Sequence, residues 1–458
     1  MQVYCNTEPV IDEIAARQPS VVLAFRAENV RSFRDSVEFS LMATGLAEDR
    51  YVRAVNWREG GSPVDVLAAA GIFGANGSGK SNLLKVMDDM RWLVLHSFRL
   101  GDPEGGVSRR PFVLDRSCLT KPSRYEIDLV VDGVRHEYGF LVDDHRVLRE
   151  WAYWYPKGRA ALIFRREGED VEVGSVDRQK TRAVQELIRP NALFLSTAAS
   201  AKHGALLPLY QWFSRNLLLA QADSRPWRQA LTTEMLGDDE SRHRVLELLQ
   251  AADLGVTGAR KSEPDPVMQE RLRRAVRILQ GIEGEPEGDE GPTFEELGVR
   301  LIHRGVDGEA VVLEAEDESF GTRVWFGLIG PVVQALEHGS VFLADEIDAS
   351  LHPALVTELV RLFQDPETNP RRAQLVFNTH DPTLLGDSVS ERLLGRDQIW
   401  FTEKSHDGST RLYPLADLDP RRQEAIGKRY LDGRYGAIPI LSHQEFAAAV
   451  ASEAVVAH

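Results

Sequence analysis

Cysteine is scarce in this sequence of 458 residues, which holds two thiols, Cys5 and Cys118. Two cysteines exclude a disulfide framework and a zinc site of four thiolates, and they fit a reducing compartment. Apolar runs of the roughly 20 residues that a membrane span needs are also missing. The first residues carry acidic groups in place of the basic start and apolar core of a secretory signal. We therefore expect a cytoplasmic protein that does not enter a membrane.

Basic charge is in deficit, because 70 Asp and Glu outnumber 54 Lys and Arg and give a net charge of −16. Such a balance argues against a surface that coats nucleic acid by charge alone. Two local basic clusters stand against this background, and a solvated helix face is the favoured explanation of the first. They are Arg271, Arg273, Arg274 and Arg277, and then Arg421, Arg422, Lys428, Arg429 and Arg434.

Sustained heptads and internal repeats are absent too, which excludes a long coiled-coil arm. Composition and periodicity divide the chain into five parts. Residues 1–20 form an extension, 21–175 hold a first α/β segment and short β-rich runs, and 176–298 a helical lobe with an acidic, flexible loop at 281–292. Residues 299–441 return to alternating strands and helices, and 442–458 form a tail.

Short apolar runs separated by turn residues predict an antiparallel sheet within 107–175, with strands at 125–131, 134–142, 151–155 and 161–164. Helical spacing predicts helices at 183–188, 206–219, 245–252 and 268–279. Farther on, strands at 340–344 and 373–378 alternate with helices at 324–336 and 351–363. Alternation of this kind indicates a mostly parallel sheet with ligands at the carboxyl ends of its strands.

Residues 64–87 are the most informative stretch. A buried apolar run leads into a glycine-rich turn, and a helical pattern follows. The turn reads Gly74, Ala75, Asn76, Gly77, Ser78, Gly79, Lys80, Ser81, and Asn82 comes next. Glycines allow a tight loop whose N–H groups point inward, and the helix start adds positive potential, so the segment predicts a phosphate cradle. All residues from Gly74 to Asn82 are predicted to bind the nucleotide, with Lys80 meeting two phosphates and Ser81 holding Mg²⁺.

Two further strand ends carry polar residues that suit phosphoryl chemistry. Asp345 and Glu346 follow the apolar strand at 340–344, where Asp345 could hold a Mg²⁺-bound water and Glu346 could polarise the attacking water. His380 ends the next strand, where an imidazole could contact a γ-phosphate and sense its loss. With Lys80, these residues form the predicted catalytic group.

These motifs resemble those of the ABC-class ATPases, which include transporter motors, SMC proteins and RecF-like repair ATPases. Residues 74–81 are similar to their Walker A motif, 341–346 to Walker B, 348–353 to the D-loop and His380 to the switch histidine. Residues 318–322 resemble a divergent signature loop. The resemblance implies a P-loop ABC-type head, with a mixed sheet and an antiparallel β-subdomain, that carries a helical lobe. It further implies ATP held with Mg²⁺ between the subunits of a homodimer, or of a higher oligomer. Ser319, Gly321 and Thr322 would then act in trans on the nucleotide, and Asp348 would also bind it; a polar, glycine-containing turn is the alternative explanation of residues 318–322.

Within that class the chain most resembles the stand-alone AAA-type, AbiL-like ATPases of abortive-infection phage defence. The likeness extends over residues 21–441 and is carried by 25–33, 189–196, 397–404 and 430–439. It implies an RloB-like Toprim nuclease as the partner, which would supply any contact with nucleic acid. By likeness to repair ATPases, Arg31 and Ser32 would face the phosphates, with a surface Arg-Ser pair as the equal alternative.

The class usually has a glutamine after Walker A that senses Mg²⁺ and the attacking water. No glutamine occurs between Lys80 and Arg178 in this sequence. A group near Arg110 to Phe112 is the substitute that the sequence offers. The main functional hypothesis is an ATP-dependent switch that licenses a nuclease against phage. A RecF-like ATPase that clamps DNA is the alternative; a transporter motor and a slowly hydrolysing, nucleotide-held scaffold are weaker ones.

Overall fold

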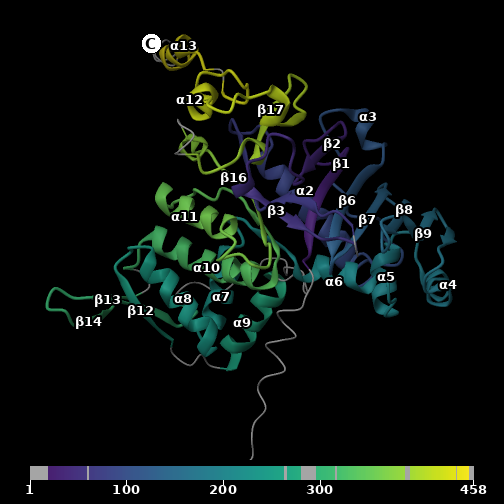
Figure 1. Cartoon of the computed structure of the whole chain (residues 1–458), viewed down its shortest axis with the longest axis horizontal. Helices are drawn as coiled ribbons and strands as arrows, with labels where there is room; N and C mark the ends of the chain where they lie inside the picture. Colours follow the sequence, from purple (N-terminus) through teal and green to yellow (C-terminus); the bar gives the residue numbers. More distant parts are fainter. Residues whose placement is uncertain are drawn as a thin grey trace, which may run out of the picture.

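The computed structural model describes residues 19–58, 61–261, 266–279, 296–314, 317–386, 392–439 and 441–452 (Figure 1). Cys5, the predicted acidic loop at 281–292 and most of the predicted N-terminal extension lie outside these residues. No helix within the described ranges is both long enough and apolar enough to cross a membrane.

Among the described residues, six strands form a central sheet in which all neighbours are parallel except β17 and β18. In spatial order these strands are β11 (Leu217–Ala220), β15 (Val341–Ala344), β16 (Gln374–Asn378), β5 (Ala69–Gly74), β17 (Ile399–Lys404) and β18 (Thr410–Pro414). The predicted mostly parallel sheet is therefore confirmed. Parallel strands have both faces covered, and β5, β15 and β16 are buried along their whole length.

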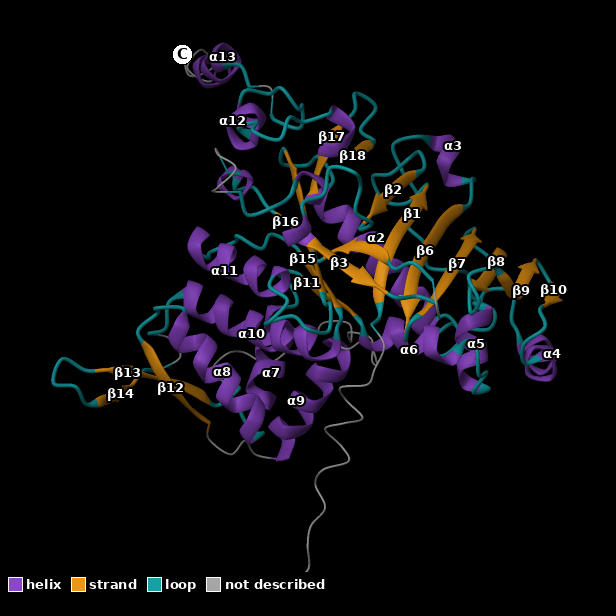
Figure 2. Cartoon of the chain, in the orientation of Figure 1, coloured by secondary structure: helices purple, strands orange, loops and turns teal. Residues whose placement is uncertain are grey.

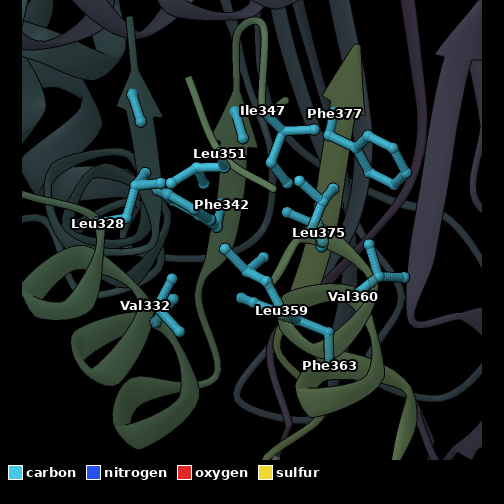
Figure 3. Packing of buried hydrophobic residues seen from close by; sticks show 14 of the residues in the cluster. Leu328, Val332, Phe342, Ile347, Leu351, Leu359, Val360, Phe363, Leu375 and Phe377 are labelled. Carbon is cyan, nitrogen blue, oxygen red and sulfur yellow. The ribbon is translucent and has the colours of Figure 1, made fainter. Parts of the chain in front are cut away.

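Alternate side chains of the central strands enter two different hydrophobic cores. Phe342, Leu375 and Phe377 point toward α10 (Phe320–His338) and α11 (Pro353–Gln364), as Figure 3 shows. Val341 and Val376 face α2 (Lys80–His96) on the other side. The sheet is thus fixed between helices, and this positions its carboxyl ends.

A second sheet is antiparallel and packs against the α2 side of the molecule (Figure 2). In the described part of the chain its order is β10 (Asp170–Val173), β9 (Ala161–Glu167), β8 (Val147–Trp154), β7 (Val134–Val142), β6 (Ser123–Val131), β1 (Val21–Glu28) and β2 (Val37–Ser40). The antiparallel prediction is confirmed, although the exposed strand β10 was not predicted. A small β-ribbon, β3 (Val52–Val55) with β4 (Val64–Leu67), precedes β5. The apolar run at 64–73 therefore contains two strands, since β4 turns into this ribbon before the chain enters the central sheet.

Within the predicted helical lobe lie α7 (Arg225–Met235), α8 (Asp239–Ala251) and α9 (Pro266–Leu279), and α10, which lies outside its predicted bounds, packs against α7 and α8. A three-stranded sheet of β12 (Val256–Lys261), β13 (Val299–Arg304) and β14 (Ala310–Val312) lies beside it. Helices α7 and α10 lie close together. Thr232 Oγ1 on α7 donates to the Phe326 carbonyl of α10 and accepts from the Gly330 N–H of the same helix. On α9, Arg271 and Arg273 pair with Glu296 and Glu270, as expected for a solvated face.

The predicted helix at 206–219 is wrong in its last four residues. Helix α6 (Leu207–Arg215) ends early, and Leu217 begins β11, the outer strand of the central sheet. A short apolar run fits a buried strand as well as a helix, so periodicity could not separate them. Helices α5 (Phe194–Ser200) and α6 pack against α2, and α4 (Arg178–Leu187) packs against α5 and β10; the boundary predicted at residue 176 stays a prediction.

The remaining elements are short. They are α3 (Arg116–Leu119), α12 (Ile426–Leu431) and α13 (His443–Ser452), with 3₁₀ turns at Asp49–Tyr51, Pro382–Leu385, Arg396–Gln398 and Leu415–Leu418. In α12, Tyr430 stacks on Phe401 and lies against Phe73, so the C-terminal segment covers the core beneath the glycine-rich loop.

Candidate functional site

The glycine-rich loop joins β5 to α2 at the carboxyl edge of the central sheet, as predicted. Gly77 and Gly79 have φ of 74° and 106°, which glycine adopts without strain. A Cβ on Gly79 would lie 2.1 Å from Thr410 Oγ1, whereas nothing lies within 4 Å of one on Gly77. The first N–H groups of α2 have no acceptor within the helix, so the loop and helix start together form an anion-binding cradle.

Lys80 is the first residue of α2 and is 5% exposed. Its Nζ donates to the carbonyls of Gly74 and Ala75, at 2.7 and 3.1 Å, and lies 3.3 Å from His380 Nδ1. Burial is the largest influence on this ammonium group and lowers its pKa to about 8, against the nearby carboxylates of Asp348, Glu346 and Asp345. The structure thus brings Lys80 and His380 together, as the sequence predicted.

Asp345 and Glu346 follow β15 directly, at the same edge of the sheet. Asp345 is half-buried, and its Oδ2 lies 4.0 Å from Lys85 Nζ. Glu346 is exposed and has φ of 52°, a left-handed conformation that costs a residue with a side chain free energy. The carboxylate of Glu346 is therefore available to a substrate, on a backbone that neighbouring groups must hold.

Asn378, the last residue of β16, is a site residue that the sequence reasoning missed. Its Nδ2 donates to Asp345 Oδ1 at 2.6 Å and lies 3.4 Å from Ser81 Oγ, while its Oδ1 accepts the Glu346 N–H at 2.5 Å. The side chain is fully buried. The spatial order β15–β16–β5, which the sequence does not state, is the signal that would have identified it.

The oxygen donors at this edge fit magnesium. Ser81 and Asp345 share Asn378 as a neighbour, so a hydroxyl and a carboxylate oxygen lie close together. Mg²⁺ prefers oxygen ligands and is often held by one or two side chains together with phosphates. Within the described ranges, no group of three or more His, Cys, Asp or Glu side chains could hold a metal alone. Ser81 and Asp345 would hold the ion, whose charge would offset that of the phosphates.

A glutamine also lies at this edge of the sheet, although the segment between Lys80 and Arg178 contains none. Gln221 follows β11 directly, and the Asp345 N–H donates to the Ala220 carbonyl at 2.8 Å. The Gln221 carbonyl accepts from Arg228, a 5% exposed residue whose pKa burial lowers to about 10. Gln221 lines a cavity of about 700 Å³ together with Arg31 and Lys85. It lies far along the chain because β6 to β10 of the antiparallel sheet, with α4 to α6, come between α2 and β11.

Arg31 and Ser32 lie beside the glycine-rich loop, where both are bonded to protein groups. Arg31 donates to both carboxylate oxygens of Asp89 on α2, at 2.5 and 2.7 Å. Ser32 Oγ accepts from Asn82 Nδ2 and from Thr410 Oγ1, each at 2.7 Å. The Ser32 contacts brace the start of α2 and the Arg31 pair holds the middle of the same helix, while direct contact of Arg31, Ser32 or Asn82 with phosphates stays a prediction.

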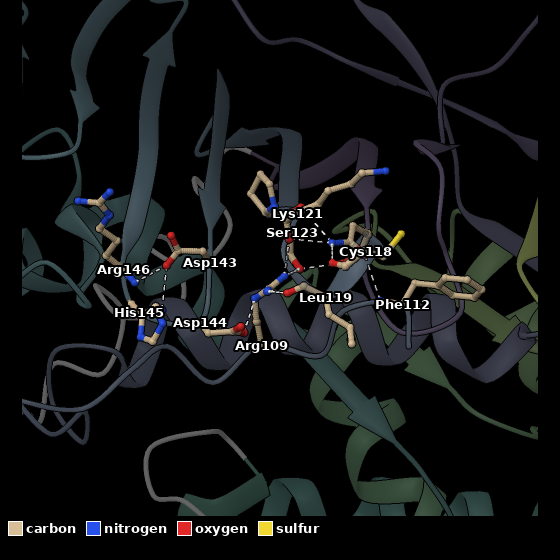
Figure 4. A network of polar contacts seen from close by, with 12 residues as sticks. Arg109, Phe112, Cys118, Leu119, Lys121, Ser123, Asp143, Asp144, His145 and Arg146 are labelled. Atoms are coloured by element: carbon tan, nitrogen blue, oxygen red, sulfur yellow. Dashed lines mark hydrogen bonds and ion pairs between the residues drawn. The ribbon is translucent and has the colours of Figure 1, made fainter. Parts of the chain in front are cut away.

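The loop around 109–123 lies against Arg31, and a catalytic role for a group near Arg110 to Phe112 stays a prediction. Arg109 donates to the carbonyls of Leu119 and Lys121 at 2.6 and 2.7 Å, and to Asp144 (Figure 4). The loop held in this way places the Arg110 carbonyl 2.6 Å from the Arg31 N–H.

The signature-like loop forms the start of α10. Ser319 is its N-cap, and its Oγ accepts from the Thr322 N–H at 3.0 Å and contacts Thr322 Oγ1 at 2.8 Å. A Cβ on Gly321 would lie 2.9 Å from the Ser350 carbonyl, so this loop touches the segment that resembles a D-loop. Asp348, two residues before Ser350, accepts the His380 N–H at 3.3 Å. The roles of these residues in trans stay predictions.

Comparisons with known proteins agree with a nucleotide-binding head. The family profile described as "AAA domain, putative AbiEii toxin, Type IV TA system" matches residues 69–386, which is more than half of the chain. No curated protein matches the sequence.

Three solved structures show weaker similarity. An SMC head domain from Thermotoga maritima has 12% identity and a TM-score of 0.36, over 86% of this chain and 98% of that one. A Smc head bound to the C-winged helix domain of ScpA has 14% identity and a TM-score of 0.39, over 87% and 99%. A Smc head with an extended coiled coil, bound to a ScpA domain from Pyrococcus furiosus, has 14% identity and a TM-score of 0.36, over 87% and 98%.

Because these TM-scores lie below 0.5, the assignment rests on the family match and on the observed strand order. The chain has the fold of a P-loop ATPase head of the ABC type, with a parallel central sheet, an antiparallel subdomain and a helical lobe. It belongs to the family of AAA domains described as putative AbiEii toxins of type IV toxin–antitoxin systems.

Proposed function

We propose that the protein is a Mg²⁺-dependent ATPase that binds ATP between two copies of the chain and regulates an anti-phage effector in the cytoplasm. One observation carries the ATPase proposal. Lys80, Ser81, Asp345 and His380 come from three separate segments and meet at the carboxyl edge of one sheet. That edge is where α/β sheets bind ligands.

Each group has a role that its position supports. The cradle N–H groups and Lys80 bind the β- and γ-phosphates, and Ser81 and Asp345 hold Mg²⁺. Glu346 accepts a proton from the attacking water as general base, and His380 contacts the γ-phosphate. Gln221, next to Asp345 across the sheet, orients that water.

The dimer part of the proposal rests on the exposed loop at the start of α10. Ser319 is exposed, and its hydroxyl is already directed along the helix start with Thr322. A helix N-terminus favours anions, so this loop can close on the triphosphate of a second copy. Ser350 lies against it, and both Ser350 and Asp348 would share the interface.

The regulatory part rests on the family and on the resemblance to AbiL-like ATPases. A toxin–antitoxin family description supports a role in abortive infection. The effector would be an RloB-like Toprim nuclease, which would bring nucleic acid to the complex. Genomic position tests this part, because a Toprim-type gene beside this one is expected, and an adjacent set of transporter or repair genes would contradict it.

Replacement of Gln221 by Ala tests the ATPase assignment. The wild-type protein is expected to release phosphate from ATP in Mg²⁺ and to stop when EDTA removes the metal. Gln221→Ala should retain ATP affinity within about twofold and lose about tenfold or more in turnover, because it removes a water-orienting amide. Gln250→Ala, at an exposed position on α8, is the matched control. Equal turnover of both variants would exclude Gln221 from the site.

The depressed pKa of Lys80 predicts that ATP affinity depends on pH. The ammonium form binds phosphate, and bound phosphate raises the pKa above the value of about 8 in the free protein. Binding therefore takes up a proton at higher pH, and affinity should fall by about tenfold between pH 7 and pH 9.5. Calorimetry in two buffers of different ionisation enthalpy measures that uptake. In Lys80→Arg the cation stays protonated, so an equal pH dependence would contradict the assignment.

A further inference from the structure

Three parts of the proposed site depend on one buried amide. Asn378 is fully buried at the end of β16, between the strand that ends in Asp345 and the strand that leads to Ser81. Its side chain contacts the hydroxyl of Ser81 and the carboxylate of Asp345, the two proposed metal ligands. It also accepts the backbone N–H of Glu346, the proposed general base. An amide suits this place because it has two donors and an acceptor and carries no charge.

Asn378 also holds the turn that follows β15. Its side-chain Oδ1 accepts the Glu346 N–H at 2.5 Å, and its main-chain carbonyl accepts the Ile347 N–H at 3.2 Å. Two consecutive N–H groups are thus fixed by one residue while Glu346 has φ of 52°. Strained backbone of this kind persists only where surrounding contacts over-determine it.

The contact with Asp345 has a second consequence. Asp345 Oδ1 accepts from Asn378 Nδ2 at 2.6 Å, a hydrogen bond to a charged group that fixes the orientation of the carboxylate. Oδ2 of the same carboxylate lies 4.0 Å from Lys85 Nζ on α2, and the Asn378 Nδ2 that holds Oδ1 also lies 3.4 Å from Ser81 Oγ. Groups that orient a metal-ligating carboxylate affect metal affinity without touching the metal.

We propose that Asn378 is a positioning residue that sets the Mg²⁺ affinity of the nucleotide site, by orienting Asp345 toward Ser81, and that places Glu346 by holding its left-handed backbone. This inference rests on the proposed function. It adds a residue outside the predicted Walker A, Walker B and switch motifs, and it assigns two measurable effects to that residue, on the response of nucleotide binding to Mg²⁺ and on turnover.

The test measures the dissociation constant of a fluorescent ATP analogue with and without Mg²⁺. In Asn378→Ala the Mg²⁺-free affinity should stay within about twofold, while the gain in affinity from Mg²⁺ should shrink by about tenfold to a hundredfold. Asn378→Ser, whose side chain is too short to reach both Asp345 and the Glu346 N–H, is expected to fold and to show the same loss. Turnover at saturating Mg²⁺ should also fall in both variants.

Asn369→Ala is the matched control. Asn369 is 1% exposed just before β16, and its side chain also makes three hydrogen bonds, to Phe363 and Ala373. Its loss should lower the melting temperature comparably and leave the response to Mg²⁺ unchanged. An unchanged Mg²⁺ response in folded Asn378→Ala or Asn378→Ser overturns the inference. Failure of the wild-type protein to bind the analogue would instead refute the proposed function.

Discussion

Glu346→Gln is expected to keep its ATP affinity and to lose hydrolysis by about a hundredfold or more, which is the usual contribution of a general base. The amide has the size of the carboxylate and adopts the same backbone conformation, so the cradle and the metal ligands stay in place. It cannot accept the proton of the attacking water. Phosphate release, measured beside analogue binding, separates the two effects.

Lys80→Ala should instead lose ATP binding, the step that precedes hydrolysis. The ammonium group is buried against the loop carbonyls and would be the cation nearest to the bound phosphates. Removing a charge-assisted contact of this kind is expected to weaken ATP binding by about a hundredfold or more. The pair of variants therefore distinguishes a base from a binding residue in one assay.

Glu358→Gln is the control for both measurements. Glu358 is exposed on α11 and pairs with Arg361, so its neutralisation tests the general effect of losing one carboxylate. Its turnover and affinity should equal those of the wild type. Undiminished hydrolysis in Glu346→Gln would reject Glu346 as the base, and would leave the binding role of Lys80 standing.

Motifs that are contiguous in sequence could be predicted from it. The glycine-rich loop, Asp345 with Glu346, and His380 each follow an apolar strand, and a parallel sheet gathers its strand ends at one edge. The structure confirms that edge. Local pattern alone is enough here, because each motif is formed by a strand and the few residues after it.

Gln221 and Asn378 could not be predicted in the same way. Each reaches the site through its place beside a neighbouring strand, and strand order is a property of tertiary packing. The position of Gln221 after a strand could not be predicted either. Leu217 to Leu219 continue the apolar pattern of α6, so the residues of β11 were predicted as the end of a helix. The bracing of Ser32 by Asn82 and Thr410 likewise joins residues that are far apart in the chain.

Mixing two inactive variants is expected to restore hydrolysis if each ATP lies between two copies. Ser319→Asp keeps a good N-cap for α10 and places a negative charge where the signature-like loop would meet the partner's γ-phosphate. It should therefore fold, bind ATP in its own cradle and fail to hydrolyse it. Ser319→Asn, which caps equally well without charge, should retain most of the activity.

Complementation follows from the geometry of the pair. In a mixed dimer of Lys80→Ala and Ser319→Asp, one site combines both defects and the other combines an intact cradle with an intact loop. Random mixing should thus recover about a quarter of the wild-type activity. Lys80→Ala with Glu346→Gln is the control, because both residues belong to the same half of the site and every mixed site stays defective. If Ser319→Asp alone hydrolyses ATP normally, and its mixture with Lys80→Ala shows only the activity that the Ser319→Asp copies contribute by themselves, each copy holds a complete site, and Ser319 is a helix cap without a role in trans.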